Sequence, residues 1–377
     1  MKPSLNNPNK PRVLFLFSDT GGGHRSAAEA IIEAIHLEFP GQIECAMVDI
    51  LKHYAPPPIN RAPQIYPPLS RHLTLWSSGY RLSDGRRRTL VFYNAIWPYI
   101  RRRLSRLFDE RPSDLLVSVH QLINVPVARL AEEHGVPFVT VVTDMVTTHA
   151  AWYAPRARHV VVPTEEAFRR GVKNYMRPEQ MSVVGMPVAD RFCQPVGDRA
   201  ANRAALGWGN QRPVVLMVGG GEGMGPLEAM AAALDESGLD LSLAVVCGRN
   251  KTLKSNLEKR KWRIPAHIYG FVTEMPRFMQ SADILVTKAG PGTISEAFIA
   301  GLPMVLYSRM PGQEDGNVTY VEETGSGVWA PEPDQMVAAV RRWLEYPLEW
   351  GRAAEKCREL ARPRAAREIA RILIDQI

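Results

Sequence analysis

The stretch VLFLFSDTGGGHRSAAEAI (13–31) joins an apolar run to a helical pattern through three glycines and a histidine. The apolar run VLFLF lacks polar alternation, which is typical of a strand buried on both faces. The pattern after the glycines predicts a helix from about Ser26 to Phe39, opened by a capping box of Ser26 and Glu29. A buried strand followed at once by a helix is the repeating unit of an α/β fold with a parallel sheet.

The same alternation recurs in two sets, separated by the polar stretch 197–212. Two such sets predict two doubly wound, Rossmann-like parallel-sheet domains that face each other across a cleft, with ligands at the carboxyl ends of the strands. The predicted domains are 11–195 and 205–345, and helices in 346–377 are expected to cross back to the first domain. The candidate strands lie at 13–17, 43–50, 115–119, 138–143 and 159–163, and then at 214–219, 241–247, 267–271, 283–288 and 303–307.

Composition narrows the class of protein. The chain has 377 residues, and its four cysteines are widely spaced without a CxxC pair, which argues against a disulfide scaffold and a zinc site. The N-terminus lacks the apolar core of a signal peptide. No run approaches the roughly 18 apolar residues of a membrane-spanning helix. These features predict a soluble or peripheral protein of a reducing compartment. The cysteines are Cys45, Cys193, Cys247 and Cys357.

Positive charge is concentrated in one segment. Residues 52–111 hold 12 Arg or Lys and three acids, a balance of +9, whereas the remainder has 34 basic and 36 acidic residues, a balance of −2. Residues 53–100 also interrupt the strand–helix alternation with proline clusters and several aromatic residues. Such a long loop in a compact domain is usually functional or disordered.

The glycine–histidine turn predicts a site. Gly22 and Gly23 allow a ligand to approach the backbone closely. His24 then lies beside the positive end of the predicted helix, which disfavours the imidazolium and leaves a neutral ring suited to general-base work. The turn alone does not exclude an incidental histidine. It matches neither GxxxxGK[ST] nor GxGxxG, so it is neither a P-loop nor a dinucleotide fingerprint.

The stretch DILVTKAGPGTISEAFIAGLP (283–303) predicts a diphosphate site, because a strand ends there in a glycine-rich turn that opens a helix. The predicted ligands are the amides from Gly292 to Ile294, the Thr293 hydroxyl and the Lys288 charge, with Gly290 in the turn. Glu296, one turn into the helix, is positioned to accept from a ribose diol. An ordinary strand–helix junction with a capping threonine is the alternative.

Further strand ends point to the same site. Glycines recur in VGGGEGMG (218–225), CGRN (247–250) ends a strand with an arginine, and YGFVTEMP (269–276) offers backbone to a base edge. The loop PGQEDGN (311–317) gathers amides and acids that suit sugar hydroxyls, although a solvated turn has the same composition. The residues singled out are Gly220, Gly221, Arg249, Gly270, Phe271, Val272, Gln313, Glu314, Asp315 and Asn317.

In combination and order, these segments resemble the monogalactosyldiacylglycerol synthase and diacylglycerol glucosyltransferase group of glycosyltransferase family 28. The resemblance covers roughly residues 11 to 330. It rests on SDTGGGHRSAAEAI, VSVHQLINVP, VTDMVTTHAAWYAP, VVPTEEA, GGGEGMGPL, CGRN, GFVTEMP, VTKAGPGTISEAFIAGLP and PGQEDGNVTYVEETGSG.

The resemblance implies a GT-B fold with the UDP-sugar on the C-terminal domain and the acceptor on the N-terminal one. It implies inverting transfer of galactose or glucose from UDP-hexose to 1,2-diacylglycerol, with no catalytic metal and no other cofactor. By motif position it makes His24 the general base, Glu296 the ribose ligand, and Gly270 to Val272 the uracil contact. Gln313 and Glu314 match the sugar contacts. Asp144 is a candidate to orient the second nitrogen of His24, or else a helix cap or turn former.

A diacylglycerol acceptor gives the basic segment an interpretation as a membrane-binding region for anionic lipids. The enzyme is then peripheral, at the cytoplasmic face of the cell membrane, and does not bind nucleic acid. His120 and His149 are more readily structural or acceptor-lining residues than bases. The candidate membrane residues are Arg86, Arg87 and Arg88, with Trp76, Tyr80, Trp97 and Tyr99 as interfacial rings.

Two alternatives remain open at the level of the sequence. The acceptor can be another lipid, such as a polyprenyl lipid or a sterol. The chain can also be a non-catalytic GT-B protein that binds lipid or nucleic acid through its basic segment. No residue distinguishes galactose from glucose, which differ at one stereocentre.

Overall fold

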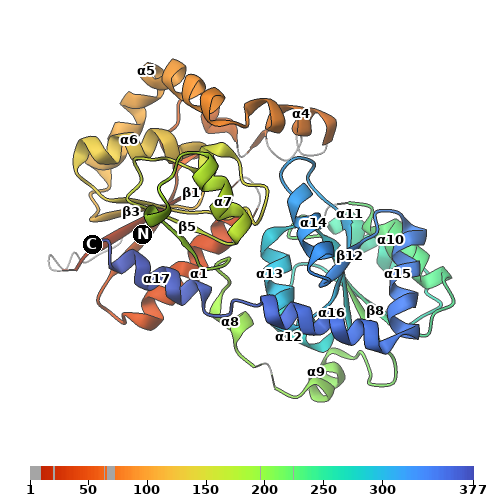
Figure 1. Cartoon of the computed structure of the whole chain (residues 1–377). Coiled ribbons are helices and arrows are strands. Elements are labelled where there is room, and N and C mark those ends of the chain that lie inside the picture. Colours follow the sequence, from red (N-terminus) through yellow and green to blue (C-terminus); the bar gives the residue numbers. More distant parts are fainter. Residues whose placement is uncertain (1–9, 20–21, 63, 66–72, 196, 224) are drawn as a thin grey trace. The chain divides into compact units, whose positions relative to one another are not determined.

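The computed structural model describes residues 10–19, 22–62, 64–65, 73–195, 197–223 and 225–377. The chain divides into two compact units, and Figure 1 shows the helices and strands of each. Unit 1 comprises Met1–Asp190 and Arg364–Ile377, and unit 2 comprises Arg191–Pro363. The helix α8 (Asp190–Cys193) lies at the boundary.

The described strands of unit 1 form a parallel sheet in the order β2-β1-β3-β4-β5-β6. The central strands are mostly apolar and, apart from Arg12, buried, as expected where helices cover both faces. The strand order reverses between β1 and β3, and ligands of open α/β sheets bind at such a switch point. The strands are β1 (Arg12–Phe17), β2 (Glu44–Asp49), β3 (Leu115–Ser118), β4 (Phe138–Val141), β5 (His159–Val162) and β6 (Met181–Val183).

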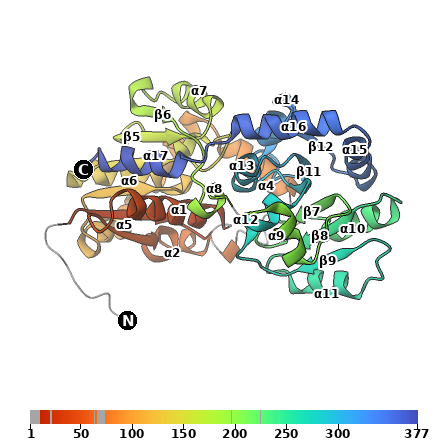
Figure 2. The same ribbon diagram turned by 90° about the horizontal axis from the view of Figure 1, so that it is seen from below.

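Helices cover this sheet, and one of them comes from the far end of the chain. Figure 2 shows α17 beside α1, and Ile31 and Ile35 of α1 share one core with Ile369 and Leu373 of α17. The helices of unit 1 are α1 (Gly23–Glu38), α2 (Ile50–Tyr54), α4 (Leu73–Ser83), α5 (Arg86–Glu110), α6 (Asn124–His134), α7 (Glu165–Lys173) and α17 (Ala365–Ile374), with short 3-10 turns η1 (Ile59–Arg61), η2 (Gln121–Ile123), η3 (Ala150–Trp152) and η4 (Pro178–Gln180).

The start of α1 differs from the prediction. The helix begins at Gly23, three residues earlier than expected, and its N-cap is Gly22, which makes no side-chain cap. The amide of Ser26 already donates to the Gly22 carbonyl at 3.1 Å. The predicted capping box at Ser26 and Glu29 is therefore wrong, because these residues lie inside the helix.

The stretch 53–100 is also not the long loop that its composition indicated. Where described, it is largely helical, and α5 runs for 25 residues with Pro98 inside it. One face of α5 buries Tyr93, Ile100 and Leu104 in the core of unit 1, against α6. The basic residues lie mostly on the opposite, exposed face, so the helix is amphipathic.

Unit 2 has a second parallel sheet, in the order β12-β11-β10-β7-β8-β9, with its switch point between β10 and β7. Its strands are β7 (Val214–Val218), β8 (Ser242–Val246), β9 (Ala266–Tyr269), β10 (Ile284–Lys288), β11 (Met304–Ser308) and β12 (Gly327–Trp329). Its helices are α9 (Arg199–Leu206), α10 (Leu227–Glu236), α11 (Lys251–Lys259), α12 (Met275–Ser281), α13 (Pro291–Ala300), α14 (Asp315–Glu323), α15 (Pro333–Glu345) and α16 (Pro347–Leu360).

The last two helices belong to different units. The α16 helix packs on α13 in unit 2, whereas α17 packs on α1 in unit 1. The chain therefore passes from unit 2 to unit 1 in the short segment between these helices.

Candidate active site

The switch point of unit 1 brings polar residues from three strand ends together. His24 follows β1 in the first turn of α1, His120 follows β3, and Thr143 follows β4. Among the described residues, a Cβ atom built on Gly22 or Gly23 would have no heavy atom within 4 Å, so these residues leave the N-terminus of α1 open to approach. This is the edge of the sheet where ligands of doubly wound folds bind.

The ring of His24 is held by a short relay. Its Nδ1 lies 2.9 Å from Oγ1 of Thr143, and this hydroxyl donates to the Val119 carbonyl at 3.3 Å. Burial lowers the pKa of His24 to about 4, and a hydrogen bond to the Val119 carbonyl offsets part of that effect. The ring is therefore neutral near pH 7, as the sequence predicted, with burial as the main cause.

His120 lies against His24, with ring centroids 4.6 Å apart in an edge-on arrangement. Its side chain is buried, and its Nδ1 accepts from the Leu122 amide at 3.4 Å. Burial, and then the charge on His24, lower the pKa of His120 well below its usual value. His120 is thus a wall of the His24 site that also caps the η2 turn.

Asp144 supports a second wall. Its Oδ2 accepts from the Trp152 indole at 2.7 Å, and both side chains are buried. The Trp152 ring lies 6.2 Å from the His24 ring. The described hydrogen bond of Asp144 is thus to Trp152, whose ring lies beside the His24 ring. Thr143 makes the hydrogen bond to His24 itself. Sequence reasoning missed Thr143 and Trp152, although both lie in the motif VTDMVTTHAAWYAP; a hydroxyl at the end of a buried strand was the available signal.

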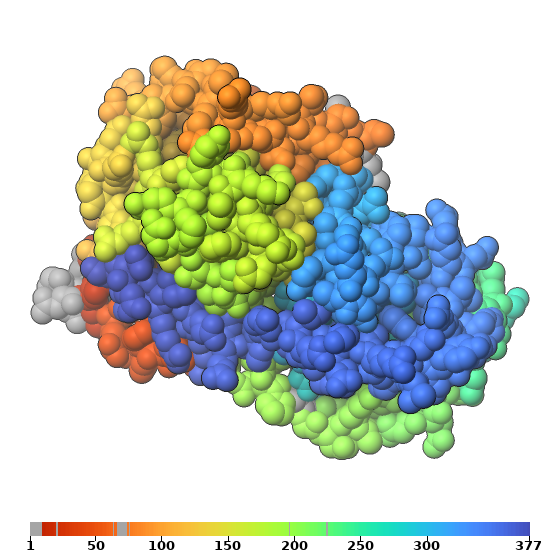
Figure 3. All heavy atoms as spheres, viewed as in Figure 1, coloured from red at the N-terminus to blue at the C-terminus, as the bar shows by residue number. Residues whose placement is uncertain are grey.

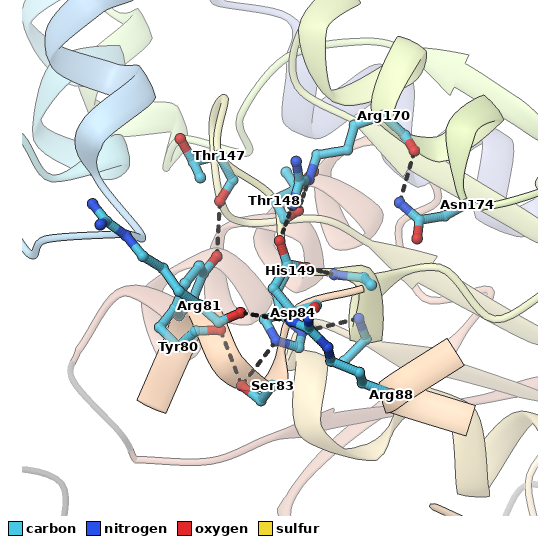
Figure 4. A network of polar contacts seen from close by, with 12 residues as sticks. Tyr80, Arg81, Ser83, Asp84, Arg88, Thr147, Thr148, His149, Arg170 and Asn174 are labelled. Atoms are coloured by element: carbon cyan, nitrogen blue, oxygen red, sulfur yellow. Dashed lines mark hydrogen bonds and ion pairs between the residues drawn. The ribbon is translucent and has the colours of Figure 1, made fainter. Parts of the chain in front are cut away.

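His149 lies in a polar network between the 147–150 loop and the turn that joins α4 to α5 (Figure 4). Its Nδ1 accepts from the Ala151 amide at 3.1 Å, and its Nε2 lies 3.2 Å from the Ser83 hydroxyl. Asp84 accepts from the Ala150 amide at 2.9 Å and pairs with Arg170. The network fastens the predicted membrane segment to the loop that follows Asp144.

Tyr80 belongs to this network and not to an exposed surface. Its side chain is buried, and its hydroxyl donates to the Thr147 carbonyl at 2.9 Å. Burial raises the pKa of Tyr80 well above its usual value, so the hydroxyl stays protonated and able to donate. The prediction of Tyr80 as an interfacial ring is wrong, because the ring packs inward.

The other predicted rings differ in exposure. Tyr99 is exposed and donates to the Pro57 carbonyl. Trp97 is half-buried, packs on the core and lies 4.1 Å below the Arg129 guanidinium. Trp76 is half-buried beside Tyr80. Of the four predicted rings, Tyr99 alone is largely exposed.

The three consecutive arginines are not equivalent. Arg86 donates to the Asn174 carbonyl at 3.0 Å and lies over the Tyr175 ring. Arg88 donates to three carbonyls at the end of α4, at 3.3 to 3.4 Å (Figure 4). The Arg87 side chain is exposed, and among the described residues it has no hydrogen-bond partner. Arg86 and Arg88 thus have structural partners that the sequence did not indicate, whereas Arg87 is available at the surface.

In unit 2 the residues predicted to bind the UDP-sugar lie in a row along the strand ends, each beside the next. Lys288, at the end of β10, pairs with the buried Glu314 at 2.9 Å, and Glu314 also accepts from the Met310 amide at 2.7 Å. Asn317 donates to the Ala289 carbonyl at 2.9 Å. Its Oδ1 is buried and, among the described residues, has no partner. Three residues predicted from two separate motifs therefore meet beside the β10 turn.

The row continues across the glycine-rich ends of β7 and β8. Gly220 has a φ of +72°, and a Cβ there would lie 3.3 Å from Cε of Lys288. Gly248 has a φ of +58°, and a Cβ there would lie 2.4 Å from the Gly221 carbonyl oxygen. The Arg249 amide donates to that same carbonyl at 2.8 Å. Only glycine allows the two loops to approach this closely.

The far end of the row is more exposed. Arg249 pairs with Glu222 at 2.8 Å and lies 5.0 Å from the exposed Phe271 ring. Gly270 adjoins Gly248, because a Cβ on it would lie 3.8 Å from the Gly248 carbonyl oxygen. Val272 is half-buried in the next turn.

The N-terminus of α13 supplies fewer amides than predicted. The Ile294 amide donates to the Gly290 carbonyl at 3.0 Å inside the helix, and the Ile294 side chain is buried. The Gly290 amide donates to the Lys288 carbonyl. The prediction of Ile294 as an amide donor to phosphate is therefore wrong. No bond is described for the amides of Gly292 and Thr293, which leaves these two for a ligand.

Glu296 is half-buried in the second turn of α13, and no hydrogen bond is described for it. Burial raises the pKa of Glu296 to about 8, with Arg191 acting in the opposite direction. A carboxyl with this environment can hydrogen-bond a hydroxyl without the cost of burying a full charge. Gln313 is half-buried in the loop before α14, next to Glu314.

The described residues contain neither a metal-binding cluster nor a membrane-spanning helix. No three His, Cys, Asp or Glu side chains there are arranged to hold a metal ion. No helix described in the chain has the length and apolar character needed to span a membrane.

Solved structures share this architecture. Acinetobacter baumannii MurG aligns with 97% of this chain and 99% of its own length, with a TM-score of 0.61 and 15% identity. The S. aureus MnaA-UDP co-structure aligns with 97% of this chain and 98% of its own, with a TM-score of 0.64 and 13% identity. The predicted GT-B fold is confirmed.

Sequence comparisons identify the family. Residues 24–188 match the family model "Monogalactosyldiacylglycerol (MGDG) synthase" and residues 214–344 match "Glycosyltransferase family 28 C-terminal domain". The "Probable monogalactosyldiacylglycerol synthase 3, chloroplastic" of Oryza sativa subsp. japonica is 36% identical, over 95% of this chain and 73% of its own length.

Two further relatives agree. The spinach (Spinacia oleracea) "Monogalactosyldiacylglycerol synthase, chloroplastic" is 38% identical, over 89% of this chain and 67% of its own. For "Monogalactosyldiacylglycerol synthase 1, chloroplastic" of Arabidopsis thaliana the identity is 37%, over 88% of this chain and 64% of that protein. The resemblance seen in the motifs is confirmed: this chain is a glycosyltransferase and belongs to the monogalactosyldiacylglycerol synthase family.

Proposed function

We propose that the protein transfers a hexose from UDP-hexose to the free hydroxyl of 1,2-diacylglycerol, with inversion at the anomeric carbon. The observation that carries the proposal is His24, a neutral histidine fixed by Thr143 at the open switch point of unit 1, in a chain of this family. The relatives are named as synthases of monogalactosyldiacylglycerol, which favours galactose over glucose.

Inversion needs one displacement and one base. In the proposed step, His24 takes the proton of the acceptor hydroxyl while the oxygen attacks the anomeric carbon and UDP departs with the bonding electron pair. A histidine that lost its proton only near pH 6.5 would be partly charged at neutral pH. Because burial lowers the pKa of His24, nearly all molecules carry the neutral, proton-accepting ring at neutral pH.

The row in unit 2 is proposed to bind the UDP-hexose. The amides of Gly292 and Thr293, with the dipole of α13, suit the diphosphate, and Lys288 adds positive charge beside it. Glycines 220 and 221 let the backbone approach the phosphates, and Arg249 lies next to them. These groups stabilise the charge that develops on the departing UDP.

The remaining donor contacts follow the resemblance. Glu296 is proposed to bind the ribose, and Gly270, Phe271 and Val272 the uracil. The loop of Gln313, Glu314 and Asn317 is proposed to bind the sugar. The orphaned Oδ1 of Asn317 supports this assignment, since a buried acceptor without a partner is costly unless a ligand hydroxyl donates to it.

The outer face of α4 and α5 is proposed to meet a membrane peripherally. This face, orange in Figure 3, is exposed and combines large apolar side chains with arginines. Anionic headgroups attract such arginines, by about 1 kcal/mol for each residue near the surface. This surface leaves out Tyr80, which is buried, and Arg86 and Arg88, which donate to backbone carbonyls. Its residues are Leu82, Val91, Phe92, Tyr99, Arg87, Arg102 and Arg103.

The function is tested by offering the protein diacylglycerol in anionic vesicles together with UDP-galactose or UDP-glucose. The expected product is a monoglycosyldiacylglycerol, identified by mass spectrometry, with a β-linkage by NMR if the donor is α-linked. An α-linked product contradicts inversion. Vesicles that also contain a sterol and a polyprenyl phosphate make the acceptors compete, and transfer to either in place of diacylglycerol contradicts the proposed acceptor.

A further inference from the structure

The hydrogen bonds around Thr143 determine which nitrogen of His24 carries the proton. The Thr143 hydroxyl has one hydrogen, and it donates this hydrogen to the Val119 carbonyl, which can only accept. Nδ1 of His24 lies 2.9 Å from the same hydroxyl oxygen, which then offers only lone pairs. The hydrogen of that bond therefore belongs to Nδ1, and Nε2 of the neutral ring is bare.

The opposite arrangement is disfavoured. If Thr143 donated to Nδ1, the carbonyl of the fully buried Val119 would lose this hydrogen bond. The rings of His120 and Trp152 pack against His24 and hold its plane.

We propose that Thr143 is a positioning residue that fixes His24 in the Nδ1–H tautomer, so that Nε2 is the atom that accepts the proton of the acceptor hydroxyl. The inference rests on the proposed function and specifies how its base is prepared. In the step, the acceptor O–H bond breaks and its proton joins Nε2. The oxygen electron pair forms the glycosidic bond, and the electrons of the bond to UDP leave with UDP. The Nδ1–H bond to Thr143 then becomes charge-assisted and stabilises the imidazolium.

The chain offers a matched pair of threonines for the test. Thr140 lies three residues earlier, is equally buried, and its hydroxyl has no partner among the described residues. Thr143→Val removes the relay, whereas Thr140→Val makes the same chemical change without removing a hydrogen bond. Thr143→Ser keeps the hydroxyl and is expected to restore activity.

We expect Thr143→Val to lower kcat by about 10- to 100-fold, the range usual when a group that orients a functional side chain is lost. The KM for UDP-hexose should stay unchanged, because unit 2 is intact. Thr140→Val and Thr143→Ser should remain within a few-fold of the wild type. Equal kcat values for Thr143→Val and Thr140→Val, both folded by thermal unfolding, would overturn the proposal.

A spectroscopic measurement decides the tautomer without activity. In ¹⁵N-histidine NMR, with the His24 signals identified by their loss in His24→Gln, the wild type should show a protonated Nδ1 and a bare Nε2. Thr143→Val should shift the population toward the Nε2–H form. A wild-type Nε2–H tautomer would refute the proposal. A wild type that transfers no hexose contradicts the proposed function alone, and the spectrum still decides the role of Thr143.

Discussion

The strand ends of unit 1 and unit 2 hold polar groups in different ways. In unit 1 the central groups are neutral, buried or half-buried, and joined by hydrogen bonds, as in the relay from His24 through Thr143 to Val119. In unit 2 they are charged or bare: Lys288 pairs with Glu314, glycine loops expose backbone, and Glu296 has no described partner. A base needs one fixed proton position, whereas a diphosphate needs amides and positive charge, so the two strand edges suit the two different tasks proposed for them.

The largest expected effect comes from replacing His24, the proposed general base in unit 1. His24→Ala should lower kcat by about 100- to 10,000-fold, since it removes the proposed general base. Binding of UDP, measured by calorimetry, should be retained because the row in unit 2 is unchanged. His36→Ala is the control, since His36 lies exposed on the same helix. Wild-type turnover in His24→Ala would remove the contrast between the two sites.

The second effect tests the close approach of the glycine loops in unit 2. Gly248→Ala should reduce kcat/KM for UDP-hexose by up to about 100-fold, because its Cβ would displace the Gly221 carbonyl and misplace the loop. Gly238→Ala shares the positive φ, +72°, but its Cβ would meet nothing within 4 Å. The control therefore carries the same backbone strain without the clash. Equal losses in both variants would show that strain, and not the loop contact, is responsible.

A smaller effect distinguishes neighbouring arginines on α5. Arg87→Gln should weaken binding to anionic vesicles by about fivefold, which corresponds to about 1 kcal/mol. Arg88→Gln should instead lower thermal stability, since Arg88 bonds three carbonyls at the end of α4. Co-sedimentation with vesicles and thermal unfolding separate these outcomes. Vesicle binding that is unaffected by Arg87→Gln would contradict the proposed membrane surface.

The smallest expected effect is a pH dependence of stability in unit 2. The pKa of Glu296 is raised to about 8 in the folded chain, so its contribution to stability is present at low pH and is lost as the pH rises through about 8. Glu296→Gln keeps an uncharged side chain. The Tm difference between this variant and the wild type should therefore widen from about pH 5 to about pH 8. Glu323→Gln, on the exposed face of α14, is the control and should show a constant difference.

The lowered pKa of His24 predicts that the stability of unit 1 changes with pH in the opposite direction. Its pKa is lowered to about 4, so the stability gained by a neutral ring is present above about pH 6.5 and is lost as the pH falls toward 4. A constant Tm difference for Glu296→Gln across the same range would show that the Glu296 carboxyl is ionised throughout. The Glu296 carboxyl and the His24 imidazole would then no longer give opposite pH dependences of stability.

The strands could be predicted because short apolar runs without polar alternation are typical of strands buried on both faces. All ten predicted strands are present, within one or two residues. The edge strands β6 and β12 were missed, since each has three residues and provides little pattern. The α4 and α5 helices were not predicted, because the prolines and arginines of this segment obscure its helical pattern. Burial of Tyr93, Ile100 and Leu104 on one face outweighs those local signals.

The candidate site was predictable in outline and not in its contacts. Residues at strand ends must meet at one edge of a parallel sheet, so His24 and Lys288 could be assigned from order alone. The partners of these groups come from distant segments. Thr143 lies 119 residues from His24, and Glu314 lies 26 residues from Lys288. Orientation also escaped prediction, as the buried Tyr80 and Ile294 show.

The sequence by itself determined the two parallel sheets, the glycine-rich strand ends and the family, since these depend on local pattern and on motif order. The tertiary structure alone decided which nitrogen of His24 is bare, which of Arg86, Arg87 and Arg88 donate to backbone carbonyls, and which amides of α13 remain for a ligand. Those properties depend on how hydrogens and charges are shared among groups far apart in the chain. Such sharing is fixed only when the chain has packed and water has left the site.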